Sequence, residues 1–303
     1  MVAMQAATAV KPDLTVVIVS RNAAATVRDC LDALRRQKTV HTFTVVLIDS
    51  STDDTVELVR RDFPEVHLLH SPERMYCGDG RNLGVAQAES TLIAFLDADC
   101  IAADDWVERL CEAHEQQCVA VGGAIANREP SSLTAWASYF CEFSRWIPGM
   151  PAQWMDDMAG ANLSYKIKAL RAFMPFIGGT YCSDTELHWR LTAAGHAIRF
   201  EPTVKVYHTS LDKPLAYLRH EFLHGRSFAR VRVAAGRIGG FSRFAYAIGF
   251  PAVAGILLLR IVRRVLAAGG YGYPLFVSSP LIAAGVLSWS LGECTGYFSR
   301  RMK

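Results

Sequence analysis

The chain has 303 residues, 51% of them hydrophobic, and is therefore long enough to bury a substantial core. Its formal net charge of +3 is too small over this length to indicate a nucleic-acid-binding protein. Mean hydropathy is positive, at +0.15, which favours contact with a membrane. We therefore expect lipids or small molecules as partners, and no nucleic acid.

The cysteines and the N-terminus indicate a reducing environment. Eight cysteines are scattered along the chain without the C-x-x-C pairs of tetrahedral metal sites or redox motifs, so we expect reduced thiols. Residues 1–13 lack the basic start and long apolar core of a secretory signal peptide. The globular part is therefore expected to face the cytoplasm.

Residues 14–122 alternate between short apolar, β-branched runs and longer helix-like stretches, a pattern typical of an α/β sheet with helices on its faces. The predicted strands are residues 14–19, 43–48, 66–70, 91–96 and 119–122. The predicted helices are residues 24–37, 53–62, 80–88 and 105–116. Continuous apolar strands of this kind are buried on both faces of a parallel sheet.

After residue 122 the pattern and composition of the chain change twice. Residues 124–209 are less regular, and their Trp, Pro and Gly content predicts loops and short helices that complete a cleft. Residues 211–243 interleave Arg and His with aromatic side chains, which predicts amphipathic helices at a membrane interface.

Two apolar segments follow, at residues 244–259 and 273–291, and only the second approaches the ~20 residues of a spanning helix. Arginines between the segments and basic residues at the C-terminus give conflicting signals for topology. Three arrangements stay open: a spanning hairpin, an in-plane or re-entrant hairpin, and buried helices of a soluble domain.

Two carboxylates follow a buried strand directly. The apolar run at residues 92–96 ends in Asp97-Ala98-Asp99, and ligands bind at the carboxyl ends of strands in open α/β sheets. Carboxylate oxygens suit Mg²⁺ or Mn²⁺, which neutralise the charge of a departing diphosphate. The alternative is an ordinary turn that caps the helix beginning near Asp104.

Five further stretches, in order, resemble glycosyltransferase family 2 of the GT-A type. They are residues 17–22 (VIVSRN), 47–55 (LIDSSTDDT), 80–84 (GRNLG), 160–165 (GANLSY) and 183–191 (SDTELHWRL). The resemblance implies that Ser20, Asn22 and Asp49 contact the nucleotide, with Arg81 near its phosphates. It also places Asp97 at the donor and Asn162 near the sugar and the acceptor.

The resemblance also departs from the family at two places. Ile48 stands where the commoner form has an acid, so Asp49 alone would read the base, with uridine expected and guanosine possible. Ser183 replaces the first acid of the later motif, but Asp184 occupies the place of the catalytic base. An inverting transfer needs such a carboxylate to deprotonate the acceptor. The alternative is that Asp184 merely begins a helix.

Three histidines and an arginine are further candidate site residues. His208 resembles a histidine that related enzymes place beside the metal or diphosphate, although a lone histidine after a strand is often structural. His220, His224 and Arg226 are candidates for an acceptor phosphate, and a solvated helix face explains them nearly as well.

Together these features predict a tail (residues 1–13), a GT-A catalytic domain (14–210), interfacial helices (211–243) and hydrophobic membrane segments (244–303). The expected function is inverting transfer of a sugar from a nucleotide sugar to a lipid-linked or glycan acceptor, with Mn²⁺ or Mg²⁺. The expected location is the inner, cytoplasmic membrane.

Two alternatives remain. A sugar-phosphate nucleotidyltransferase would carry a glycine-rich basic loop after its first strand, and residues 20–24 lack the glycines. A catalytically silent membrane scaffold would have no need to keep Asp97, Asp99 and Asp184.

Overall fold

The computed structural model describes residues 11–128, 130 and 132–299, and it centres on one mixed sheet of nine strands. The strand order is β3-β2-β1-β4-β8-β6-β9-β5, and β7 pairs with β9 off this path. The strands are β1 (Leu14–Ser20), β2 (Phe43–Asp49), β3 (His67–His70), β4 (Leu92–Asp97), β5 (Cys100–Ala102), β6 (Ala120–Asn127), β7 (Gln153–Met155), β8 (Asn162–Lys166) and β9 (Ile198–His208). This α/β architecture confirms the predicted fold class.

The first half of the sheet is parallel and accounts for the nucleotide-binding motifs. Strands β3, β2, β1 and β4 run in the same direction, so the loops after them meet at one edge. In register, Ser20 lies beside Asp49 and Val19 beside Asp97. Strand β8 runs antiparallel between β4 and β6, and this pairing joins the second half of the sheet to the first.

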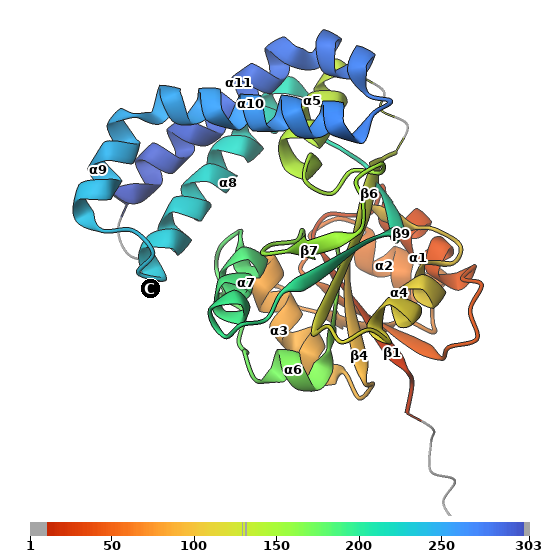
Figure 1. The fold of residues 1–303 in the computed structure, drawn as a ribbon. Coiled ribbons are helices and arrows are strands. Elements are labelled where there is room, and N and C mark those ends of the chain that lie inside the picture. The colour runs from red at the N-terminus through yellow and green to blue at the C-terminus, as the bar shows by residue number, and fades with distance from the viewer. Residues whose placement is uncertain (1–10, 129, 131, 300–303) are drawn as a thin grey trace, which may run out of the picture.

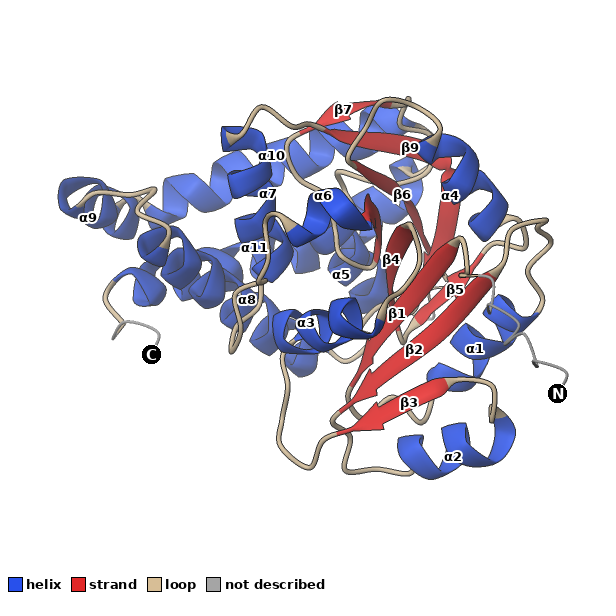
Figure 2. Ribbon diagram, turned by 90° about the horizontal axis from the view of Figure 1, so that it is seen from below, coloured by secondary structure: helices blue, strands red, loops and turns tan. Residues whose placement is uncertain are grey.

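Helices cover both faces of the sheet (Figure 2). One face carries α1 (Val27–Arg35), α2 (Thr55–Asp62) and α4 (Trp106–His114), and the other carries α3 (Cys77–Gln87), α6 (Ile167–Arg171) and α7 (Ser183–Ala193). Four of these helices match the predicted ones, since α1, α2, α3 and α4 lie within or next to the expected ranges.

The remaining helices form a second layer beyond one end of the sheet (Figure 1). This helical layer contains α5 (Leu133–Phe143), α8 (Pro214–Ala234), α9 (Gly240–Ile248), α10 (Phe250–Ala268) and α11 (Gly272–Tyr297). Helix α11 packs along α8 at very close range, because a Cβ at Gly225 would lie 2.0 Å from the Trp289 carbonyl oxygen. A Cβ at Gly292 would lie 2.0 Å from the Phe222 carbonyl oxygen.

Helix α8, predicted to lie at a membrane interface, packs within the helical layer. Its buried residues include Tyr217, Glu221 and Ala229, and its other side faces a pocket at the sheet. Among the described residues, α11 is the one helix long and apolar enough to cross a membrane by itself. Helices α9 and α10 reach that length only as a pair, bent by 76°.

Candidate active site

The loops after β1 and β2 are tied together by the side chains expected at the nucleotide. Ser20 donates a hydrogen bond from Oγ to Asp49 Oδ2. Asn22 takes a left-handed backbone conformation, with φ of 53°, and its Oδ1 accepts a bond of 2.8 Å from the Thr52 amide. Ser20 also lines a small cavity of about 150 Å³ next to Tyr181.

Asp49, which is predicted to read the nucleobase, is fully buried. Its Oδ2 accepts bonds from the hydroxyls of Ser20 and Ser51, and its Oδ1 accepts from the Ser51 amide at 2.8 Å. His70 at the end of β3 lies 2.9 Å from Oδ1 through its Nδ1. Both carboxylate oxygens of Asp49 are engaged and the residue has no exposed surface, so Asp49 holds together the loops after β1 and β2. Its partner His70 is partly exposed.

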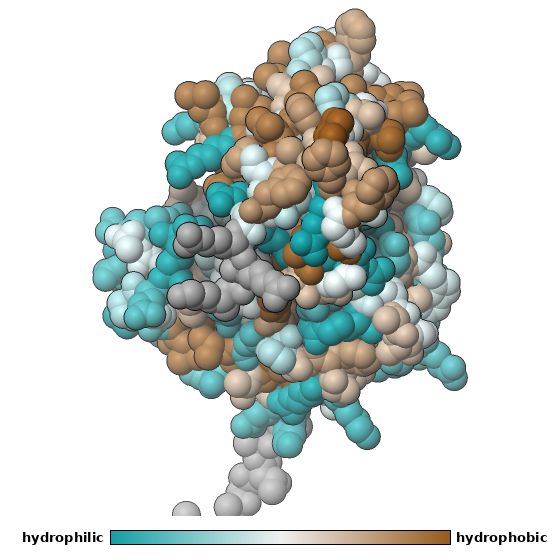
Figure 3. Space-filling model, turned by 90° about the vertical axis from the view of Figure 1, so that its left-hand side faces the viewer, coloured by the Kyte–Doolittle hydropathy of each residue, from teal (hydrophilic) through white to brown (hydrophobic). Residues whose placement is uncertain are grey.

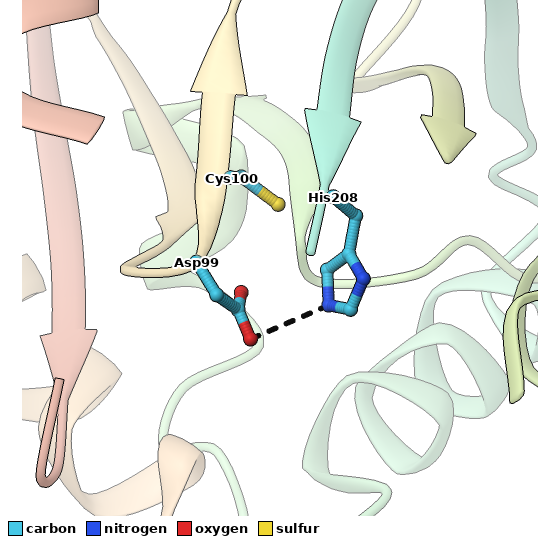
Figure 4. Close-up of side chains that lie close together, drawn as sticks. All are labelled: Asp99, Cys100 and His208. Carbon is cyan, nitrogen blue, oxygen red and sulfur yellow. Dashed lines mark ion pairs between the residues drawn. The ribbon is translucent and has the colours of Figure 1, made fainter. Parts of the chain in front are cut away.

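Asp97 and Asp99 flank the turn between β4 and β5, as the sequence predicted. Strand β5 pairs with the end of β9 so that Cys100 lies opposite His208, which brings the histidine to Asp99. His208 Nε2 lies 3.4 Å from Asp99 Oδ2 (Figure 4).

The two carboxylates differ in proton affinity. Loss of hydration, together with the neighbouring Asp99, raises the pKa of Asp97 to about 6. Burial also opposes the charge on Asp99, but His208 outweighs it and lowers the Asp99 pKa below its usual value. Burial likewise opposes charge on His208, yet Asp99 raises the pKa of the imidazole to about 9.

The cluster has the chemistry of a hard-cation site. Asp99 Oδ1 is buried without a hydrogen-bond partner in the described structure, as expected for an atom that awaits a ligand. Asp99, Cys100 and His208 each offer an atom, and these atoms lie within 4.8 Å of one another. Burial raises the pKa of the Cys100 thiol well above its usual value, and sulfur is too soft a ligand to suit Mn²⁺ or Mg²⁺.

Arg81 lies between the two acidic centres. Its Nη2 lies 3.9 Å from Asp97 Oδ1, and its Nη1 lies 3.8 Å from Asp184 Oδ2. The guanidinium is almost completely buried and stacks against the Phe95 ring at 5.5 Å. Gly160 makes room for it, since a Cβ there would lie 2.0 Å from Arg81 Nη2. Buried positive charge therefore lies between Asp97 and the expected base, Asp184.

Asp184 lies in the first turn of α7 and points into the same pocket as Asp97. Cys182 precedes the helix in a left-handed conformation, with φ of 63°, which turns the chain sharply into α7. Asp184 Oδ2 accepts a bond of 2.8 Å from the Gly160 amide. Burial opposes its charge, but Arg81 lowers the pKa below the usual value, so Asp184 is ionised near neutral pH.

A buried network beside Asp184 was not predicted. Asp157 Oδ1 lies 2.8 Å from His188 Nδ1, and His188 Nε2 lies 2.7 Å from the Tyr165 hydroxyl. His188 is fully buried on α7, so this chain of bonds fixes the helix that carries Asp184. The sequence held one signal for it, the acidic pair 156–157 directly before the Gly160 motif.

The pocket has a volume of about 270 Å³ and lies between the sheet and the helical layer. Asp97, Arg81 and Asp184 line its floor, and His220 and His224 of α8 line the opposite side. Glu142 of α5 also lines it, and its Oε1 lies 3.9 Å from His220 Nε2. Arg226, predicted together with the two histidines, lies in a different, neighbouring pocket.

Asn162, which is predicted to lie near the sugar and the acceptor, does not line this pocket. Its Oδ1 accepts a bond of 2.9 Å from Trp106 Nε1, and its Nδ2 donates to the carbonyls of Ala124 and Val204 at 3.0 and 2.9 Å. All three bonds are internal and the residue is buried. Asn162 therefore has a structural place, joining β8 to its neighbours.

Comparison with known proteins agrees with this geometry. Residues 15–174, more than half of the chain, match glycosyl transferase family 2. Among curated proteins, the pre-mycofactocin glycosyltransferase of Mycobacterium tuberculosis is 26% identical over 232 residues, covering 73% of this chain and 48% of that protein. The chain thus spans about half the length of the curated relatives of this kind.

Two solved structures share the fold at low identity. The mannosyltransferase PcManGT from Pyrobaculum calidifontis, in complex with GDP-Man and Mn²⁺, aligns with a TM-score of 0.63 at 18% identity, covering 93% of this chain and 87% of that one. TarS of S. aureus, in complex with UDP-GlcNAc, aligns with a TM-score of 0.51 at 15% identity, covering 95% and 93%. The chain shares the fold of these structures, and by its match to the family model it belongs to glycosyl transferase family 2.

Proposed function

We propose that the protein is an inverting, metal-assisted glycosyltransferase that takes its sugar from a nucleotide sugar and passes it to an acceptor at a membrane. The observation that carries the proposal is the shared pocket of Asp97 and Asp184, with Arg81 between them. Asp97 lies at the proposed metal site, and Asp184 lies on the opposite side of the Arg81 guanidinium. Inverting transfer needs a metal site for the leaving diphosphate and a base for the acceptor, and this arrangement keeps the two apart.

Asp97, Asp99 and His208 would hold Mn²⁺ or Mg²⁺, which supplies charge neutralisation for the diphosphate of the donor. The unpartnered Asp99 Oδ1 supports this assignment from within the structure. The solved neighbour PcManGT binds GDP-Man with Mn²⁺, and TarS binds UDP-GlcNAc. Both purine and pyrimidine nucleotides thus occur on this fold, so both belong in the donor screen.

Asp184 is the proposed general base. Its ionised Oδ2 would take the proton of an acceptor hydroxyl while that oxygen attacks the anomeric carbon. The bond from this carbon to the diphosphate oxygen breaks as the new glycosidic bond forms, and the nucleoside diphosphate leaves. General-base assistance of this type contributes about 10²–10⁴-fold in rate. The Gly160 amide and Arg81 hold the carboxylate in place and ionised.

Ser20 and Asn22 are proposed to shape the nucleotide site through the loops that they fix, with Arg81 beneath the donor. The nucleotidyltransferase alternative has no support, since the loop after β1 lacks glycines and the chain is a family 2 glycosyltransferase.

The assay for the proposed function is sugar transfer or donor hydrolysis by the purified protein with Mn²⁺. We expect one nucleotide sugar from a panel of UDP- and GDP-sugars to be consumed, and chelation to stop the reaction. Asp99→Asn should abolish the stabilisation of the protein by Mn²⁺ plus nucleotide, because a ligand of the native state raises its apparent stability. Consumption that is unchanged by chelation and by Asp99→Asn would contradict the metal assignment.

Membrane attachment is proposed to occur through the outer face of the helical layer. Large apolar side chains are exposed on α9, α10 and α11, among them Phe241, Phe244, Ile256, Tyr273 and Phe276. Figure 3 shows apolar side chains gathered over the helical layer and polar ones over the sheet layer. A lipid-linked acceptor fits this placement, because the catalytic pocket lies directly below the helical layer.

The packing of α11 favours an in-plane arrangement in one leaflet over a transmembrane span. Helix α11 contacts α8 along its length, and a Cβ at Gly296 would lie 2.5 Å from the Arg226 carbonyl oxygen. A spanning α11 would carry α8 into the hydrocarbon with Arg226 and Arg230, at a cost of about 2.5–3.5 kcal/mol for each charge near the centre. The eight free thiols support a location on the cytoplasmic side.

A further inference from the structure

A second pocket, lined by arginines, lies next to the catalytic one. It has a volume of about 280 Å³ and is walled on one side by α8 and on the other by the loops before α3 and α7. Its lining residues are Arg74, Tyr76, Gly179, Tyr181, Arg219, Leu223, Arg226, Ser227 and Arg230. We call this the arginine pocket.

The α8 side of the arginine pocket is a single helical face. Arg219, Leu223, Arg226 and Arg230 recur at the three- and four-residue spacing that aligns side chains along an α-helix. Arg74 joins them from the opposite wall and stacks on the Tyr76 ring at 4.6 Å. Four guanidinium groups thus converge on one space from two parts of the chain.

This positive charge has no counter-charge within the described residues. Arg74, Arg219, Arg226 and Arg230 form no ion pair there, and no acidic side chain lines the arginine pocket. Asp79, in the first turn of α3, is already engaged, because its Oδ2 accepts bonds from the amides of Tyr76 and Gly179 at 3.0 Å each. Clustered arginines repel one another, so an arrangement of this kind is stabilised by a bound anion.

A buried donor atom points to the same conclusion. Arg230 is only partly exposed, and its Nε is buried without a hydrogen-bond partner in the described structure. Unsatisfied buried donors are rare, and a guanidinium presents its hydrogen bonds in a fork that matches phosphate oxygens. Phosphate is therefore the anion that fits these side chains best.

The arginine pocket is placed for the acceptor. Tyr181 lines both the catalytic pocket and the arginine pocket, so the two are separated by one side chain. The proposed diphosphate site of the donor lies at Asp97 and Asp99, and neither residue lines the arginine pocket. A molecule whose reacting hydroxyl lies at Asp184 can therefore extend past Tyr181 and reach the arginines with another part.

We propose that the arginine pocket binds a phosphate or diphosphate group carried by the acceptor. The acceptor part of this inference rests on the proposed function, whereas the binding of a phosphate group does not. The acceptor thus belongs to the class of phosphorylated, lipid-carried molecules, and the anionic group recognised here is distinct from the nucleophile at Asp184.

The test compares two double variants of equal charge change. Arg219→Gln/Arg226→Gln removes two exposed arginines from the pocket. Arg36→Gln/Arg60→Gln removes two exposed arginines, one directly after α1 and one in α2, that form no ion pair in the described structure. Calorimetry with inorganic pyrophosphate in excess chelator measures the site without the donor's metal. We expect binding by the native protein, unchanged binding by the control, and weakening of about tenfold per arginine removed in the pocket variant.

Measuring donor affinity shows whether the arginine pocket binds the donor or the acceptor. With Mn²⁺ present, the pocket variant is expected to bind the nucleotide sugar as the native protein does, while its KM for a phosphorylated acceptor rises. A short isoprenyl diphosphate should compete with pyrophosphate. Retained pyrophosphate binding in the pocket variant, an equal loss of donor affinity, or exclusion of the isoprenyl diphosphate would each overturn the proposal. A protein that binds pyrophosphate here but transfers no sugar would contradict the proposed function instead.

Discussion

The Arg81 guanidinium lies 3.8 Å from the Asp184 carboxylate, and the guanidinium is buried while the carboxylate is partly exposed. The same guanidinium lies 3.9 Å from Asp97 at the other end of the pocket floor. The buried Arg81 guanidinium therefore lies close to two carboxylates that have different proposed roles. Without it, Asp97 and Asp184 would raise each other's pKa, and neither would stay ionised as readily.

Arg81→Gln should shift the acid limb of the activity profile to higher pH. A neighbouring positive charge favours the ionised carboxylate, so its removal raises the pKa of Asp184 and leaves the base protonated at a higher pH. The expected shift is about one pH unit or more. The measurement is kcat between pH 5 and 8, with Arg81→Lys as the variant that keeps the charge. An unchanged acid limb in Arg81→Gln would show that Asp184 does not depend on Arg81.

Asn162→Ala tests whether Asn162 has a structural role or binds the donor. The change removes three internal hydrogen bonds and leaves the Trp106 indole and two carbonyls unpaired, at a cost of roughly 2–4 kcal/mol. We expect a lower thermal midpoint with nearly native donor affinity below it. A native midpoint combined with a tenfold loss of donor affinity would restore the binding role predicted from the sequence.

His114 should make stability fall in mild acid. It is buried, its Nε2 lies 2.9 Å from the Ser164 hydroxyl, and burial together with nearby Lys166 lowers its pKa to about 3. Between pH 6.5 and 3 the unfolded chain binds a proton here and the folded chain does not, so stability decreases as the pH falls. The loss is up to about 1.4 kcal/mol per pH unit for this one group.

Thermal unfolding of the native protein and of His114→Gln, followed from pH 7 to pH 4, checks this prediction. The variant keeps a hydrogen-bonding side chain but cannot titrate, so its midpoint should fall less steeply with acid. Parallel curves for the two proteins would mean that His114 titrates normally in the folded state.

Exposed phenylalanines of the helical layer should govern attachment to lipid. Phe241 and Phe276 are 87% and 77% exposed, whereas Val40, 85% exposed, lies far from this layer between α1 and β2. Phe241→Glu/Phe276→Glu should weaken binding to phospholipid vesicles by tenfold or more, and Val40→Glu should leave it unchanged. Release of the native protein by alkaline carbonate is expected for in-plane attachment, and resistance to it would favour a spanning α11.

The parallel half of the fold was predictable because its strands are continuous apolar runs that end in polar motifs. Strands β1, β2 and β4 lie within one residue of the predicted ends. Asp97 and Asp184 line one pocket and His208 lies 3.4 Å from Asp99, while the roles of these residues stay predictions. Strands β5, β7, β8 and β9 were not predicted. They are short, or, like β9, they contain Pro202 and pair across a bulge, so they lack the periodicity that marks a strand.

The roles of individual polar side chains were harder to predict from the sequence. Asp49 and Asn162 lie within motifs of the family, yet each uses its oxygens on internal partners that only the tertiary fold brings close. Amphipathic composition predicted α8 as a helix, but composition does not reveal that α11 packs against it. The network of Asp157, His188 and Tyr165 depends on contacts between residues 23 and 31 positions apart.

Asp184→Asn tests the central claim most directly, with Glu186→Gln as the matched control. Both positions lie in the first turn of α7, but Glu186 pairs with Arg190 and does not line the catalytic pocket. Sugar transfer and donor affinity are measured in parallel, with Mn²⁺ and the nucleotide sugar that the protein consumes. We expect Asp184→Asn to lower transfer by about 10²–10⁴-fold at nearly native donor affinity, and Glu186→Gln to stay within a few-fold of the native rate. Full transfer by Asp184→Asn would contradict the proposed mechanism.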